Sequence, residues 1–284
     1  MRISRLRCNR RIGIWALAIG MALSLGACAD SGAEQNRTGQ ASDADWRDRL
    51  TRQDRETQYE SAQEMDLSGV QDAVVEILED GDYLLTGDYE GKIVIDVCED
   101  EIVHLYLNNV NIVSSDGPAM DVRSAAKVIL TVMEDTENVF SDSAYYEDSA
   151  QAKACIYAVC DLTINGSGSL YVYGYYKDGI RSKDCIKILD SQLYVQTKGD
   201  CIRGNDGILI YGAALELEGE GCGLRTTDTG KDDRGIVASD EAWLKVTAGE
   251  SAIYSAADVY LIGSEYYFST VQEEIRAGGE THIE

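Results

Sequence analysis

Acidic side chains recur at a fixed spacing in the second half of the chain. Asp178 and Asp200 occupy equivalent positions about 22 residues apart, and Asp184 and Asp206 repeat at the same interval. If the repeats stack as neighbouring strands, each pair lies within about 4.8 Å. Carboxylates that close repel each other unless a cation lies between them. Because Ca²⁺ prefers oxygen ligands, these four residues are candidate calcium ligands.

Arginines follow the same repeat at Arg181, Arg203 and Arg225. Planar guanidinium groups repeated along a surface match the carboxylates of a uronic-acid polymer. The alternative is that these arginines pair with the neighbouring aspartates in a solvated lattice that contributes little to stability. The sequence leaves both interpretations open.

Tyrosines form a third column. Tyr171 and Tyr194 fall at positions where strand alternation points side chains outward. Exposed aromatic rings offer the flat amphipathic surface on which sugars stack. Tyrosine is also a common strand residue, which is the alternative explanation. Further tyrosines are expected near this column: Tyr173, Tyr175, Tyr176 and Tyr211.

These columns depend on a repeated segment. The sequence KDGIRSKDCIKI at 177–188 returns as GDCIRGNDGILI at 199–210 and in shorter form as GCGLRTT at 221–227. Apolar residues in each copy alternate with polar ones, which indicates two or three short strands joined by turns. A strand-only repeat of this length predicts an all-β solenoid, with coils of about 22–25 residues stacked on each other.

The N-terminus indicates export. Five arginines precede an apolar run that ends at Leu25-Gly26-Ala27-Cys28. We interpret residues 1–27 as a secretory signal, and its end resembles a bacterial lipobox that would attach lipid to Cys28. Residues 28–65 are polar and predict a flexible tether. The solenoid domain is expected over 66–284, on the extracellular face of the membrane and held there by the lipid anchor alone.

Cysteines are even in number in the expected domain, and an exported chain permits disulfides. Cys160 and Cys185 lie on adjacent repeats, as do Cys201 and Cys222, so we expect these two disulfides. Two other cysteines, Cys98 and Cys155, have no obvious partner.

Several runs carry a family resemblance: DGIRSKDCIKI, GDCIRGND, LTINGSGSLYVYG and, upstream, YLNNVNIVSSDGPAM. Over about residues 74–262 the chain resembles the bacterial carbohydrate-binding β-helix family typified by a clostridial cellulose- and pectin-binding surface protein. The fold of that family is similar to that of pectate lyases. The resemblance implies a right-handed parallel β-helix, bound calcium and binding to plant-type polysaccharide. Cys160, Cys185 and Cys201 stand where the family has Asp or Gly, which affects any calcium site at those positions.

Catalytic motifs are absent from the sequence. His104 and His282 are the only histidines, and no serine-hydrolase, zinc-protease or P-loop pattern occurs. The formal net charge of −25 argues against nucleic acid as a partner. We therefore expect a monomeric, non-catalytic surface lipoprotein that binds a cellulose- or pectate-like polysaccharide with the help of calcium. The alternatives are a pectate-lyase-like eliminase and a structural or adhesive surface protein.

Overall fold

A computed structural model describes residues 46–146, 152–229 and 234–284. Within these ranges the chain consists of strands joined by turns, preceded by two short 3₁₀ helices. The expected signal peptide, Cys28 and the tether up to residue 45 lie outside the described residues. Among the helices in the described part, none has the length and apolar character needed to cross a membrane.

One sheet has nine strands, and all its neighbouring strands are parallel. Arg181, Arg203 and Arg225 point out of it, so we call it the arginine face. Its strands, in spatial order, are β2 (Val74–Ile77), β4 (Lys92–Asp96), β6 (Met120–Ser124), β9 (Ala154–Ala158), β12 (Asp178–Ser182), β15 (Ile202–Gly204), β18 (Leu224–Thr226), β21 (Ile253–Ser255) and β24 (Ile275–Ala277).

The second sheet has sixteen strands and two arms, which meet at the long strand β5 (Ile102–Val113). The first part of β5 pairs with β7 and its last part with β8, so the sheet divides there. Beyond β5 the sheet continues through β3 (Gly81–Glu90) to β1 (Gln63–Asp66).

Each arm forms one further face of the molecule. The strap face, named after a segment described below, contains β7 (Lys127–Val132), β10 (Asp161–Asn165), β13 (Cys185–Leu189), β16 (Gly207–Tyr211), β19 (Ile236–Asp240), β22 (Val259–Ile262) and β25 (Thr281–Ile283). The tyrosine face contains β8 (Glu137–Ser141), β11 (Ser169–Gly174), β14 (Gln192–Thr197), β17 (Ala214–Gly219), β20 (Trp243–Ala248) and β23 (Glu265–Thr270).

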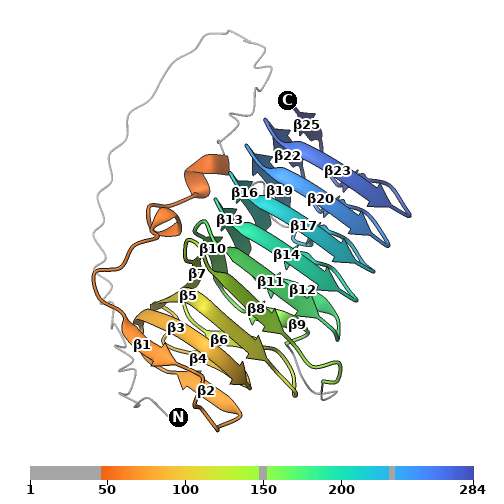
Figure 1. The fold of residues 1–284 in the computed structure, drawn as a ribbon. Coiled ribbons are helices and arrows are strands. Elements are labelled where there is room, and N and C mark those ends of the chain that lie inside the picture. Colours follow the sequence, from red (N-terminus) through yellow and green to blue (C-terminus); the bar gives the residue numbers. More distant parts are fainter. Residues whose placement is uncertain (1–45, 147–151, 230–233) are drawn as a thin grey trace, which may run out of the picture.

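Successive coils repeat the same path, visiting the arginine face, the strap face and the tyrosine face in turn (Figure 1). Ile180 on β12 pairs with Ile202 on β15, and Ile202 pairs in turn with Leu224 on β18. Equivalent residues therefore lie directly beside each other along the stack. The prediction of an all-β chain with stacked parallel strands is confirmed, and the right-handed sense of the coil stays a prediction.

Strand alternation produces the core. In β11, Leu170 and Val172 are fully buried, while Tyr171 and Tyr173 between and after them are partly exposed. The same inward positions in every coil join into one continuous apolar cluster along the stack. Fully burying one such aliphatic side chain contributes about 1.5–3 kcal/mol. The inward columns thus fix the register that aligns the outward side chains.

Residues 46–60 form a segment that we call the strap. It contains η1 (Trp46–Arg49) and η2 (Gln53–Arg55) and runs beside the stack from the later coils towards β1 (Figure 1). Trp46 and Leu50 pack on an outward apolar patch of the strap face. At the other end, the Tyr106 hydroxyl donates to the carbonyl of Gln58 at 3.1 Å. The prediction of a flexible tether is therefore wrong for this part of residues 28–65.

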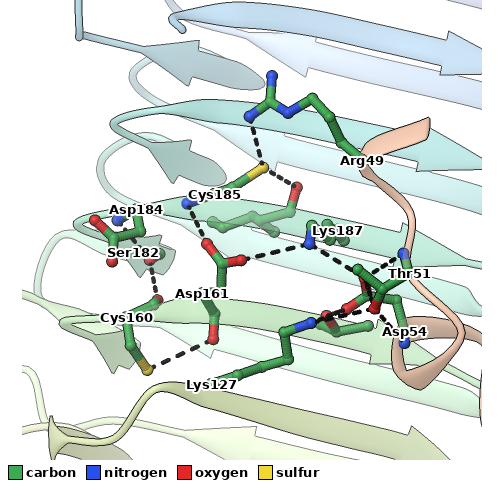
Figure 2. A network of polar contacts seen from close by, with 12 residues as sticks. Arg49, Thr51, Asp54, Lys127, Cys160, Asp161, Ser182, Asp184, Cys185 and Lys187 are labelled. Carbon is green, nitrogen blue, oxygen red and sulfur yellow. Dashed lines mark hydrogen bonds and ion pairs between the residues drawn. The ribbon is translucent and has the colours of Figure 1, made fainter. Parts of the chain in front are cut away.

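The strap is fixed by a buried polar network around Asp54 (Figure 2). The Asp54 side chain is inaccessible to solvent, and its carboxylate pairs with Lys127 at 2.8 Å and with Lys187 at 3.1 Å. The Thr163 hydroxyl donates to the same carboxylate at 2.6 Å. Burial alone would raise the pKa of Asp54, but these partners outweigh burial and lower it. The polar composition of residues 46–60 did not indicate an ordered segment, because these residues are held by polar side chains of the strands rather than by an apolar core.

None of the six cysteines that the structure describes forms a disulfide. Both expected pairs are one residue out of register. Cys185 lies opposite Asp161, whose carboxylate accepts the Cys185 N–H at 3.2 Å, so Cys160 points into the core while Cys185 faces the strap. Because side chains alternate between faces, a shift of one residue separates the two sulfurs.

Cys201 and Cys222 differ in the same way. Ile202 pairs with Leu224, so Cys201 lies opposite Gly223 rather than Cys222. Cys201 belongs to the core cluster, whereas the Cys222 thiol accepts a hydrogen bond from Arg225 at 3.0 Å outside it. The expected Cys160–Cys185 and Cys201–Cys222 disulfides were therefore wrong.

Candidate functional site

Two tyrosines stack on the tyrosine face. Tyr171 and Tyr194 are paired in register, and their ring centroids lie 4.8 Å apart with planes inclined by only 11°. This geometry is an offset aromatic stack. Both rings are partly exposed. The prediction that these tyrosines share one outward column is confirmed.

The same column continues beyond the tyrosines. Glu216, Lys245 and Tyr267 occupy the equivalent positions on β17, β20 and β23. The Lys245 ammonium lies 2.6 Å from the Glu216 carboxylate. Tyr267 is 60% exposed, and its ring centroid lies 6.2 Å from that of Trp243. Trp243 and Tyr267 were not among the residues predicted from the sequence, although both occupy outward positions in strands that alternate as β11 does.

The other tyrosines expected near this column divide between faces. Tyr173 and Tyr175 extend the tyrosine face, with ring centroids 6.2 Å apart. Tyr176 stacks on Tyr146 at 4.2 Å beside the start of the next coil. Tyr211 ends β16 on the strap face, where the Arg55 guanidinium of the strap lies over its ring at 5.2 Å. Tyr211 was therefore wrongly placed with the others.

The arginine column is confirmed as a column. Arg181, Arg203 and Arg225 are paired in register on β12, β15 and β18. The next outward position is Tyr254, and the guanidinium of Arg225 lies 5.0 Å from the centre of its ring. Arg276 continues the column on β24 and covers Tyr254 from the other side at 5.2 Å.

Acidic partners accompany all three predicted arginines. Arg181 lies 3.5 Å from Asp178, and Arg203 lies 3.5 Å from Asp200. Arg225 pairs with Asp200 at 3.1 Å and also with Glu250. Burial alone would lower the pKa of Arg225, but Asp200, Cys222 and Glu250 outweigh it and raise that pKa. The structure therefore shows the ion pairs of the alternative interpretation, but with Asp178 and Asp200 buried rather than solvated.

Asp178 and Asp200 bind backbone as well as arginine. One oxygen of Asp178 accepts the N–H of Asp200 at 3.2 Å, and one oxygen of Asp200 accepts the N–H of Cys222 at 2.9 Å. Their other oxygens face the guanidinium groups. Burial and then the charge of Asp200 raise the pKa of Asp178. Oδ2 of Asp178 is buried without a hydrogen-bond partner and lies 3.5 Å from the Arg181 guanidinium, whose positive charge occupies the place that a cation would take. Two carboxylates beside arginines do not supply the six to eight oxygen ligands that Ca²⁺ takes, so the pair does not fit a calcium ion.

Asp184 and Asp206 lie at the turn that follows the arginine face. The Arg234 guanidinium pairs with Asp206 at 3.0 Å and with Asp228 at 3.2 Å. Burial, followed by the charges of Asp206 and Asp161, raises the pKa of Asp184. Among residues 46–146, 152–229 and 234–284, no group of three or more His, Cys, Asp or Glu residues has metal-site geometry.

His104 has a structural environment. Its Nε2 lies 2.6 Å from the Thr131 hydroxyl, and its Nδ1 lies 3.1 Å from the Tyr106 hydroxyl, next to the strap. Burial lowers the pKa of His104 to about 4, with a smaller opposing effect of Glu56. The imidazole is therefore neutral near pH 7 and is held between two hydroxyls.

The geometry is that of a parallel-stranded solenoid with three outer faces, and the comparisons with known proteins place it in a family. The model of the carbohydrate-binding domain-containing protein family matches residues 71–281, so this chain belongs to that family. A protein of the same description from Acetivibrio thermocellus is 26% identical over 228 residues, which cover 78% of this chain and 80% of that protein.

A solved structure shares the fold. It is titled as a polysaccharide lyase-like protein from C. thermocellum, in a gadolinium derivative. The TM-score is 0.73 with 24% sequence identity, and the match covers 78% of this chain and 95% of that chain. The resemblance of this chain to a carbohydrate-binding family is thus confirmed.

Proposed function

We propose that this chain binds an extended polysaccharide, of cellulose or pectate type, on the tyrosine face and does not transform it. The observation that carries the proposal is the Tyr171–Tyr194 stack on the tyrosine face, where both rings are partly exposed. Aromatic rings with polar hydroxyl ends suit sugars, which have apolar ring faces and polar edges. Membership of a carbohydrate-binding family supports this assignment.

The two other faces are less suitable. The strap covers much of the strap face, where Trp46 and Leu50 bury its apolar patch. On the arginine face, Asp178 and Asp200 already neutralise the guanidinium groups that a uronate polymer would need. A ligand there would have to replace ion pairs inside the protein.

The enzyme alternative is a pectate-lyase-like eliminase. Such an enzyme needs a base that can lose its proton near working pH. The raised pKa of Arg225 is the opposite of that requirement, and Arg181 and Arg203 are held by carboxylates. Addition of polygalacturonate and calcium should therefore produce no ultraviolet absorbance from unsaturated uronate. A rising absorbance would establish the lyase.

We also propose that the chain is an exported, monomeric lipoprotein attached through Cys28, with a right-handed coil. The residues that support export lie before the strap, outside the described ranges. Calcium assistance is a separate proposal, limited to Asp184 and Asp206. An ion there would have to replace the Arg234 guanidinium.

A pull-down on insoluble cellulose and on pectate gels, with and without chelator, tests the function. We expect the mature chain to be retained on at least one polymer, and Tyr171→Ala/Tyr194→Ala to be released. Tyr260→Ala is the matched control, since Tyr260 stacks on His282 with centroids 4.6 Å apart but lies on the strap face. Equal retention of both variants would refute the tyrosine face as the binding surface. No retention of the parent chain on either polymer would refute polysaccharide binding.

A further inference from the structure

Outward residues of the tyrosine face form one uninterrupted column along six coils. Each residue pairs in register with the next, so the column is parallel to the axis of the stack. In order along the axis, the column contains Val139, Tyr171, Tyr194, Glu216, Lys245 and Tyr267. Aromatic residues therefore occupy two separate parts of the column, with an ion pair between them.

The second aromatic part is built differently from the first. Trp243 and Tyr267 lie on adjacent strands with ring planes inclined by 50°, so they form an open angle rather than a stack. Tyr267 is 60% exposed and lies on β23, the last strand of its arm, so no further described strand of that sheet packs beside it. Exposed aromatic side chains grouped on one face mark a binding surface.

We propose that Trp243 and Tyr267 form a second sugar subsite, and that one glycan chain lies lengthwise along the column across both aromatic pairs. This inference rests on the proposed function. Tyr171 and Tyr267 are four strands apart, which corresponds to about 19 Å at the usual strand spacing. The length by which an extended β-linked pyranose chain advances per sugar is similar to the distance between successive coils of the stack. A chain of about five sugars therefore spans both subsites with one sugar per coil.

The centre of the path supplies polar contacts. Lys245 and Glu216 pair at 2.6 Å, but their side chains are 50% and 42% exposed. Exposed ion pairs contribute little to stability, so the Lys245–Glu216 pair can separate at low cost, and each group can then bind a sugar hydroxyl instead. Their charges cancel, and they add no net attraction for an ionic polymer.

The charge of this face selects the ligand class. Glutamates outnumber lysines at its outward strand positions, which include Glu137, Glu216, Glu218 and Glu265 against Lys245. A polyuronate would meet like charges along this path, which weakens binding. The inferred ligand of the lengthwise path is therefore an uncharged, extended β-linked glycan.

Calorimetric titration with cello-oligosaccharides from the disaccharide to the hexasaccharide tests this path. For the mature chain we expect affinity to rise with length until about five sugars span both subsites. In Trp243→Ala/Tyr267→Ala the longest ligand should bind at least about tenfold more weakly, because one of two linked subsites is lost. The disaccharide should be affected much less.

Three results separate the possible failures. Tyr267→Ala alone replaces a side chain that is 60% exposed, so it keeps the test valid if the double variant does not fold. Parent-like affinity of both variants for the hexasaccharide, with binding lost in Tyr171→Ala/Tyr194→Ala, would overturn the second subsite and leave the proposed function standing. Retention on pectate without any binding of the cello-oligosaccharides would refute the inference that the ligand is uncharged. Retention on neither polymer would refute polysaccharide binding itself.

Discussion

Replacing Asp54 by alanine should release the strap from the solenoid. The substitution removes the common partner of Lys127 and Lys187, whose side chains are 10% and 6% exposed, and the acceptor of the Thr163 hydroxyl. Removing one partner of a buried ion pair costs about 3–5 kcal/mol, because the opposite charge stays buried without compensation. This applies to Lys127, whereas Lys187 keeps the Asp161 carboxylate at 3.4 Å. We expect a loss of about 3 kcal/mol or more in the free energy that holds the strap.

Limited proteolysis measures this loss directly, since trypsin sites lie in the strap at Arg52 and Arg55. Cleavage of a folded segment requires local opening. At tenfold per 1.4 kcal/mol, the expected loss makes cleavage about a hundredfold faster. Asp48→Ala is the matched control, because Asp48 is an exposed acid in the same strap. Equal cleavage rates in the two variants would refute the described attachment.

The same carboxylate predicts a pH dependence. The pKa of Asp54 is lower in the folded protein than its usual value of about 3.9. A carboxyl group with a lowered pKa stabilises the folded state fully above its unfolded pKa, and this contribution is lost as pH falls through the folded value. Tryptic cleavage is unsuitable in acid, so pepsin should detect strap opening below about pH 4 in the parent chain. Asp54→Ala should show no additional opening there.

Three further results are expected. Asp200→Asn should lower the free energy of unfolding, measured by urea denaturation, by about 1–3 kcal/mol, since Arg203 and Arg225 lose a charged partner. Binding of this variant to cellulose should not change. Thiol titration in denaturant without reductant should detect all six domain cysteines, and fewer than six would indicate a disulfide. The pKa of His104 is lowered to about 4 in the folded protein, so its contribution to stability is present above about pH 6.5 and is lost as the pH falls towards 4. The melting temperature of His104→Gln should therefore depend less on pH over that range. An unchanged slope of melting temperature against pH would contradict this.

Stacking was predictable from the sequence because the repeat fixes it. Once Ile180 and Ile202 occupy one inward column, the alternation of side chains places Arg181 beside Arg203 and Tyr171 beside Tyr194. The errors in the disulfide predictions concern residues at or beside the turns. Cys160 and Cys185 were paired because they lie on adjacent repeats, but the register offsets them by one residue, so one faces the core and the other the strap.

The strap and the second aromatic pair were not predictable in the same way. Asp54 lies 73 residues from Lys127 and 133 residues from Lys187 in the sequence, and no local pattern links them. Trp243 and Tyr267 follow a coil that is longer than the preceding one, because Leu217 pairs with Val246, and this change interrupts the spacing that revealed the earlier tyrosines. Long-range contacts and insertions both break the periodic signal on which the sequence analysis depended.

The proposed function depends on binding of the sugar by the tyrosine face. A crystal structure of the mature chain soaked with an oligosaccharide from the retained polymer would locate the bound sugar. We expect sugar density beside Tyr171 and Tyr194, running along the stack. Sugar density beside Arg181 and Arg203, with none on the tyrosine face, would show that the arginine face is the binding surface instead.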